Sequence, residues 1–180
     1  MQNTIQLIKE TDGVAEEITV RKIAERTQVG VGLINHYFGS KDKLIEMCVQ
    51  HIINSVVSGF RTNAKEGSSP TEVTKTAAIY VADFLMANRQ ISKISILGDL
   101  KTPKEQDNTY GSSYGFAYCM SGGHMREAYM RKAFFLVSIL QESFLRQDVL
   151  LSSLGVDYHD KVQRDAYVCE IVDMIMGGSV

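Results

Sequence analysis

The segment Ile18–Leu44 carries the pattern that most constrains how this chain can fold. Apolar residues recur at helical spacing on both sides of a tight turn at residues 27–30, and a third helix start follows directly. This is the layout of a helix-turn-helix, in which the second helix enters the major groove of DNA. We therefore expect a DNA-reading element in the first quarter of the chain.

Three positions fit the close crossing of the two helices, and a fourth departs slightly from the pattern. Ala24 supplies the small residue where the helices touch, and Val29 supplies an apolar side chain in the turn. Ile34, ten residues after Ala24, is placed to anchor the second helix in the core. Position 28 often needs a left-handed backbone, which costs a non-glycine residue such as Gln28 about 1 kcal/mol.

Helix-capping residues mark where two of these helices begin. Thr19 and Ser40 precede apolar-periodic segments, and Asp42 stands in the first turn after Ser40. The pattern predicts a helix from Lys41 to about Gly59. Its apolar side is formed by Leu44, Ile45, Cys48, His51, Ile52 and Val56.

Composition favours one all-α protein with a sizeable core. Apolar residues make up 44% of the 180 residues, there are only two prolines, and the formal net charge is -2. The overall charge gives no support for nucleic-acid binding, so any contact with DNA depends on the local basic residues at 21–26 and 41–43. We predict a three-helix DNA-binding domain over 1–50 and a helical regulatory and dimerisation domain over 51–180.

The cysteines and the apolar segments indicate a reducing, cytoplasmic location away from the membrane. Three widely spaced cysteines without a CxxC pair argue against a disulfide framework, and no apolar run reaches the length of a bilayer span. The N-terminal residues lack the layout of a signal peptide. Cys48 and His51 have a spacing that two metal ligands can use, but without a second pair nearby core packing is the better interpretation. We expect no metal and no cofactor.

Beyond residue 60 the sequence predicts further helices. Helical spacing of apolar residues predicts helices over 71–88 and 91–100, a long helix over 125–151 with a break near its end, and a last helix over 159–176. Four glycines among the aromatic residues of 109–123 leave that segment open between helix and loop.

The N-terminal pattern resembles the TetR family of transcriptional regulators. The shared residues are Thr19-Val20-Arg21-Lys22-Ile23-Ala24, Val29, His36-Tyr37-Phe38 and Ser40-Lys41-Asp42-Lys43-Leu44. The resemblance covers about residues 5–50 and implies the family's DNA contacts. By resemblance, phosphate contacts come from Thr19, Lys22, Tyr37 and Lys41. Base contacts come from Val31, Gly32, Leu33, Asn35 and His36.

The sequence also departs from the family pattern. Asn35 replaces the aromatic residue that usually precedes the histidine, which alters base reading, although an asparagine can make paired hydrogen bonds to adenine. The first helix is short, so extra minor-groove contacts are not expected. Because Gly30 and Gly32 have no side chains, the backbone on the exposed face can approach DNA closely.

The resemblance implies a ligand-responsive regulator, with repression as the expected sign. A small apolar or amphipathic molecule would release a homodimer from a palindromic double-stranded operator. Candidate pocket residues come from the aromatic-rich part of the chain: Tyr80, Phe84, Tyr114, Tyr118, His124 and Phe135. Candidate dimer residues come from the last two helices, which are apolar over wide arcs: Phe144, Ala166, Cys169 and Val172.

Two other classes of protein stay open from the residues alone. A helical protein-interaction module that has lost DNA binding fits the slightly acidic balance. A small-molecule enzyme built on 100–135 is less supported, because no recognisable catalytic motif is present. We therefore predict a regulator and not an enzyme.

Overall fold

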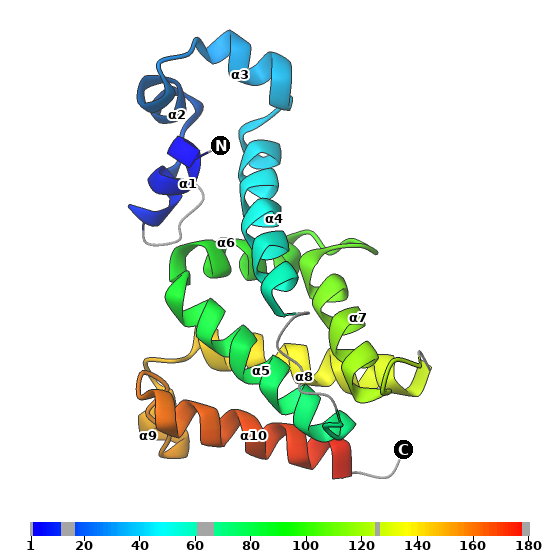
Figure 1. Cartoon of the computed structure of the whole chain (residues 1–180). Coiled ribbons are helices and arrows are strands. Elements are labelled where there is room, and N and C mark those ends of the chain that lie inside the picture. Colours follow the sequence, from blue (N-terminus) through cyan, green and yellow to red (C-terminus); the bar gives the residue numbers. More distant parts are fainter. Residues whose placement is uncertain (1, 12–16, 61–66, 125–126, 178–180) are drawn as a thin grey trace. The chain divides into compact units, whose positions relative to one another are not determined.

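The structure is a computed structural model, and it describes residues 2–11, 17–60, 67–124 and 127–177, with no side-chain description for 52–60. Every regular element in these ranges is a helix (Figure 1), which confirms the all-α prediction. The helices are α1 (Gln2–Lys9), α2 (Val20–Thr27), α3 (Val31–Phe38), α4 (Lys41–Phe60), α5 (Pro70–Ala87), α6 (Arg89–Lys101), α7 (Asn108–Met120), α8 (Glu127–Leu145), α9 (Leu150–Leu154) and α10 (Lys161–Gly177).

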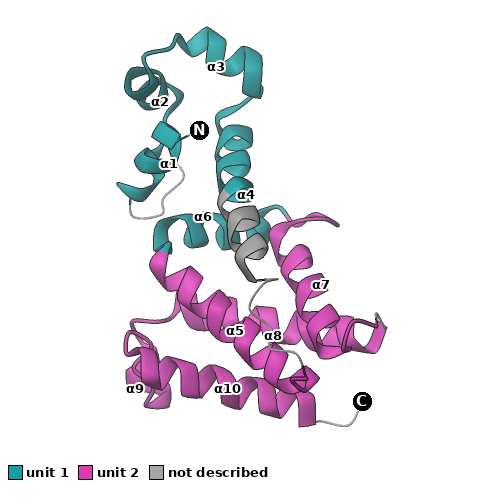
Figure 2. Cartoon of the chain, in the orientation of Figure 1, with its two compact units in different colours: residues 1–58, 88–102 teal, residues 59–87, 103–180 magenta. Residues whose placement is uncertain are grey.

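The chain divides into two compact units, shown in Figure 2. The first unit comprises residues 1–58 and 88–102, and the second comprises 59–87 and 103–180. Helix α6 therefore belongs to the first unit, although it follows α5 of the second unit in sequence. The functional division at about residue 50 remains a prediction.

One apolar cluster holds the first unit together. Its buried members come from α1, α2, α3, α4 and α6 and from the residue before Thr19: Ile8, Ile18, Ile23, Ala24, Ile34, Leu44, Ile45, Cys48, Val49, Ile91 and Ile94. Ala24 and Ile34 are buried as the helix-turn-helix pattern requires. Val29 is different, because its side chain is 37% exposed and does not fill the turn. His51 is exposed, so it does not join the buried side of α4, and the predicted positions Ile52 and Val56 lie outside the residues whose side chains the structure describes.

Local hydrogen bonds explain where the helices of this unit begin and end. The backbone amide of Lys22 donates to Thr19 Oγ1 at 3.1 Å, and that of Lys43 donates to Ser40 Oγ at 3.1 Å, so both predicted caps are present. Gln28 ends α2 in the left-handed conformation at φ 57° and ψ 33°, as its position predicts. Arg26 pairs with Glu10 and thereby ties α2 to the end of α1.

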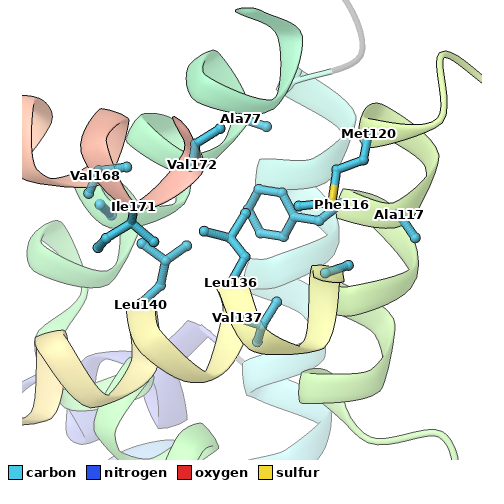
Figure 3. Packing of buried hydrophobic residues seen from close by; sticks show 13 residues of the cluster. Ala77, Phe116, Ala117, Met120, Leu136, Val137, Leu140, Val168, Ile171 and Val172 are labelled. Atoms are coloured by element: carbon cyan, nitrogen blue, oxygen red, sulfur yellow. The ribbon is translucent and has the colours of Figure 1, made fainter. Parts of the chain in front are cut away.

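The second unit is built around α5, α7, α8 and α10 (Figure 3). Leu136 of α8 points at the ring of Phe116 of α7, and Leu140 lies beside Ile171 of α10. Small residues such as Ala78 and Ala133 are completely buried, which lets the helix backbones approach closely. Burial of these side chains is the main stabilising contribution within this unit.

A polar network joins α5 to the start of α10 in the same unit. Arg164 is only 5% exposed, and its guanidinium donates to Asp83 Oδ1 at 2.7 Å and to the Tyr158 carbonyl at 2.9 Å. Lys161 Nζ lies 2.7 Å from the other oxygen of Asp83. The buried arginine is thus neutralised by a carboxylate, as a charge in an apolar interior must be.

The structure settles the segments that the sequence left open. Residues 108–120 form a regular helix in spite of their glycines, because Asp107 caps it by accepting from the Tyr110 amide at 2.8 Å. The predicted helix over 125–151 is divided where its break was expected, with α8 ending at Leu145 and α9 beginning at Leu150. Within the described ranges, no helix is long and apolar enough to cross a membrane.

Candidate nucleic-acid interface

Helix α3 presents one broad solvent face within the first unit. Ile34 is 3% exposed and anchors the helix, whereas Asn35 and His36 are exposed. At about 100° per residue, Gly32 and His36 lie almost opposite Ile34, so they form the centre of the solvent face. All five residues predicted to read bases are exposed: Val31, Gly32, Leu33, Asn35 and His36.

The chemistry of this face is unusual for a solvent-exposed helix. Helix α3 contains no lysine, arginine or acidic residue, and Val31 and Leu33 are 41% and 48% exposed. Tyr37 is 71% exposed, and the His36 ring meets the Tyr37 ring edge-on at 5.5 Å between centroids. A face that carries amide, imidazole and apolar groups, without lysine, arginine or carboxylate groups, suits the edges of base pairs, which offer hydrogen-bonding atoms and thymine methyl groups.

Candidate phosphate-binding groups belong to the same unit as this face. Lys22 lies in the first turns of α2, is exposed, and its Nζ donates to the Glu17 carbonyl at 3.0 Å. Lys41 begins α4, where its Nζ lies 3.6 Å from Asp42 Oδ1. Thr19 is exposed even though its hydroxyl oxygen caps α2, so capping does not hide it. Arg21 is a further exposed cation on α2 that was not among the predicted contacts, although the basic cluster at 21–26 contained it.

The predicted pocket residues are not gathered around one described cavity. Tyr80 and Phe84 of α5 are partly buried, whereas Tyr114, Tyr118, His124 and Phe135 are exposed. A hollow of about 360 Å³ lies elsewhere in the second unit, between α8, α9 and α10. Its lining residues are Ser138, Ile139, Glu142, Ser143, Arg146, Leu150, Ser153, Leu154 and Tyr167. Aromatic composition alone did not indicate this location, because the hollow is lined mainly by aliphatic and small polar residues.

The four predicted dimer residues divide into two groups. Phe144 and Val172 are 1% and 0% exposed and pack inside their own chain, so a partner cannot reach them on this surface. Ala166 is exposed and Cys169 is partly exposed on α10. Helical periodicity shows that a side chain is apolar, but it does not distinguish burial inside the chain from burial against a partner.

The described residues contain no cluster of three or more histidine, cysteine or acidic side chains that could hold a metal ion. Cys48 is completely buried in the apolar cluster of the first unit, and burial raises the pKa of its thiol. His51 is exposed on the same helix. The two residues do not converge on one environment, in agreement with a packing role for Cys48.

Comparison with known proteins finds similar sequences for the N-terminal part of the chain. Residues 15–48 match the family described as bacterial regulatory proteins, tetR family. The HTH-type transcriptional regulator BetI of Brucella canis is 34% identical over 71 residues, which cover 39% of this chain and 35% of that protein. BetI 2 of Chromohalobacter salexigens is 38% identical over 72 residues, which cover 36% of this chain and 35% of that protein. The chain thus matches about a third of the length of these relatives.

The fold of the whole chain also has a solved counterpart. A TetR-like transcriptional regulator from Rhodococcus sp. RHA1 superposes with a TM-score of 0.63 and 14% sequence identity, over 99% of this chain and 96% of that one. This likeness shows that the two chains share an all-helical fold over nearly their whole length. The likeness to the tetR family lies in the N-terminal part of the chain, where the family match and the BetI relatives are found.

Proposed function

We propose that this chain is a DNA-binding transcriptional regulator that reads a palindromic operator with α3. The observation that carries the proposal is the exposed, uncharged face of α3 in a TetR-family N-terminal domain. Thr19, Lys22 and Lys41 flank α3 in sequence and belong to the same unit. In DNA-binding proteins, contacts to base edges give sequence specificity, whereas contacts to phosphates position the protein on the duplex.

Selection from a pool of random duplex DNA, titrated with salt, tests this proposal. The expected result is an enriched palindrome whose binding weakens steeply as salt rises, because each neutralised phosphate releases counterions. Failure to enrich any sequence at low salt would overturn the regulator and favour a protein-interaction module.

Two substitutions separate base reading from phosphate binding. His36→Ala should reduce affinity for the enriched operator far more than for random duplex. Lys41→Ala should weaken both and flatten the salt dependence by about one unit of slope. Lys104→Ala removes the same charge from the second unit and should leave operator affinity unchanged.

A homodimer forms the second part of the proposal. Two operator half-sites about one DNA turn apart require two copies of α3 related by a two-fold axis. Large apolar side chains are exposed on the helices that the sequence assigned to dimerisation: Phe134, Phe135, Ile139, Val162 and Met174. If these side chains form one contiguous patch, such a patch is the feature that marks an interaction surface.

The oligomeric state in solution tests the dimer directly. Phe135→Glu should convert the dimer to a monomer in sedimentation, because a buried unpaired carboxylate opposes association. Leu100→Glu places the same charge at an exposed leucine of α6 in the first unit and should leave the dimer intact. A wild-type chain that sediments as a monomer at operator-binding concentrations would contradict this part.

The third part is release by a small apolar or amphipathic effector bound in the second unit, with repression as the sign that the TetR resemblance implies. Release requires the effector to bind the DNA-incompetent state more tightly than the competent one. A compound that raises the unfolding temperature of the free protein should therefore weaken operator binding in proportion to its concentration. A stabilising compound that strengthens operator binding would reverse the proposed sign.

A further inference from the structure

Gly32 stands at the centre of the exposed α3 face without any reason inside the chain for a glycine. Its backbone is helical and lacks the positive φ that would require glycine. A Cβ built at this position meets nothing within 4 Å. Glycine is among the poorest helix formers, so alanine would favour α3 more strongly. The absence of a side chain at Gly32 is therefore best explained by a binding partner that approaches this face of α3.

The surroundings of this opening are apolar on both sides. Val31 and Leu33 flank it in sequence and are 41% and 48% exposed, although a solvent-facing helix usually places polar residues at such positions. His36 follows one turn later on the same side of the helix. No lysine or arginine of α3 could direct a phosphate to this point.

One group in the major groove matches an opening of this size and polarity. The C5-methyl of thymine projects into the groove and is recognised by apolar contacts, whereas the other base edges present hydrogen-bonding atoms that need polar partners. We propose that the opening at Gly32, between Val31 and Leu33, receives the C5-methyl of one thymine in each operator half-site. This inference rests on the proposed DNA-binding function and specifies part of the sequence that α3 reads.

The experiment removes a methyl group from the DNA and, in a protein variant, adds a methyl group to α3. Each thymine of the selected operator is replaced symmetrically by deoxyuridine, which removes the methyl and leaves every hydrogen-bonding atom in place. At one thymine position the wild-type protein should lose about four-fold in affinity per half-site, the factor that burying one methyl group contributes. Across both half-sites of a dimer this becomes about sixteen-fold.

Gly32→Ala supplies the reciprocal change. It should bind the thymine operator at least ten-fold more weakly than the wild type, because its Cβ occupies the place of the DNA methyl. It should regain affinity on the duplex carrying deoxyuridine at that one position, and at no other thymine. Such rescue is not expected from a structural defect in α3.

Gly98→Ala is the matched control, because Gly98 is an exposed helical glycine of α6 in the same unit with nothing within 4 Å of its Cβ. Both variants should unfold a few degrees higher than the wild type. Only Gly32→Ala should change operator affinity.

Three outcomes would overturn the inference. These are a Gly32→Ala protein that binds the thymine operator as tightly as the wild type, an operator in which no thymine methyl affects binding, and a Gly32→Ala defect that deoxyuridine does not relieve. In each case the enriched operator would still support the proposed function. If selection enriches no sequence at all, the proposed function fails and this inference fails with it.

Discussion

Arg164 Nη2 of α10 lies 2.7 Å from Asp83 Oδ1 of α5, across 81 residues of sequence. The arginine is buried, whereas the Asp83 side chain is 37% exposed at the edge of the same unit. The pair therefore joins the helices that begin and end the second unit, and it neutralises the charge of Arg164 in the interior.

Removing the carboxylate should destabilise the protein. Asp83→Ala leaves Arg164 buried without its anion, and we expect a loss of about 2 kcal/mol in the free energy of unfolding, less than for a completely buried pair. Lys161→Ala removes another cation from the same carboxylate, but Lys161 is exposed, so its loss should be about 0–1 kcal/mol. Urea unfolding of both variants measures the difference. Equal losses would mean that Arg164 does not depend on Asp83.

The Asp83 carboxylate should also make the free energy of unfolding depend on pH. Partial burial opposes ionisation of Asp83, but hydrogen bonds from Lys161 and Arg164 outweigh it and hold the pKa of the carboxyl below its ordinary value. Because the pKa is lower in the folded state, the stabilisation is complete above the unfolded-state value of about 3.9 and disappears as the pH falls further. The stability difference between wild type and Asp83→Asn should therefore shrink below about pH 4. A difference that stays constant from pH 6 to pH 3 would contradict this.

Replacing Tyr158 with phenylalanine should not destabilise the protein. Its side chain is completely buried, and its hydroxyl has no hydrogen-bond partner among the described residues. Burial raises the pKa of the phenol, so the group stays neutral. Tyr158→Phe should be neutral or stabilising by up to about 1 kcal/mol, because an unsatisfied buried hydroxyl is removed.

Tyr167→Phe provides the comparison for that experiment. The Tyr167 hydroxyl lies 3.3 Å from Ser143 Oγ, so its removal should lower stability by about 0.5–1 kcal/mol. If Tyr158→Phe is the more destabilising of the two in thermal unfolding, its hydroxyl has a partner after all.

Substitutions of Gln28 test the backbone conformation of the turn between α2 and α3. Its left-handed backbone suits glycine and disfavours β-branched residues. Gln28→Gly should change stability by no more than about 0.5 kcal/mol, since relief of strain is offset by a more flexible unfolded chain. Gln28→Val should lose more than about 1 kcal/mol in the same unfolding assay. A valine variant as stable as the wild type would show that the turn can adopt another conformation.

The helix caps of the first unit give a fifth prediction. Thr19→Ala and Ser40→Ala each remove a side-chain acceptor from a backbone amide, and each should lose about 1 kcal/mol of unfolding free energy. Thr19→Ser keeps the hydroxyl and should stay within about 0.5 kcal/mol of the wild type. Circular dichroism during thermal unfolding would detect the difference, and an unstable serine variant would assign the effect to the threonine methyl instead.

The helix-turn-helix could be predicted from the sequence because its signals are local. Thr19 and Ser40 cap the next helix through an amide three residues later, and the conformation of Gln28 follows from the four-residue offset after Ala24. The exposed positions of α3 then follow from helix geometry once Ile34 is placed in the core.

The second unit was harder to predict because its features depend on contacts between distant segments. Phe144 and Val172 look like interface residues from periodicity alone, and only the folded structure shows that both side chains are buried within the chain. The hollow beside Tyr167 is likewise formed by three helices, and no short sequence pattern marks it. The pairing of Asp83 with Arg164 spans too many residues for any spacing rule.

The place of α6 in the first unit has a consequence for how this protein can be recombined. Ile91 and Ile94 complete the apolar cluster around Ile8, Ile23 and Leu44, yet the chain reaches them only after passing through α5. A chimera that exchanges only the first fifty residues for those of another protein of this fold would pack these two isoleucines against side chains of a different sequence. An exchange of the first unit that keeps the donor's stability should therefore transplant α6 together with α1 to α4, as two separate insertions.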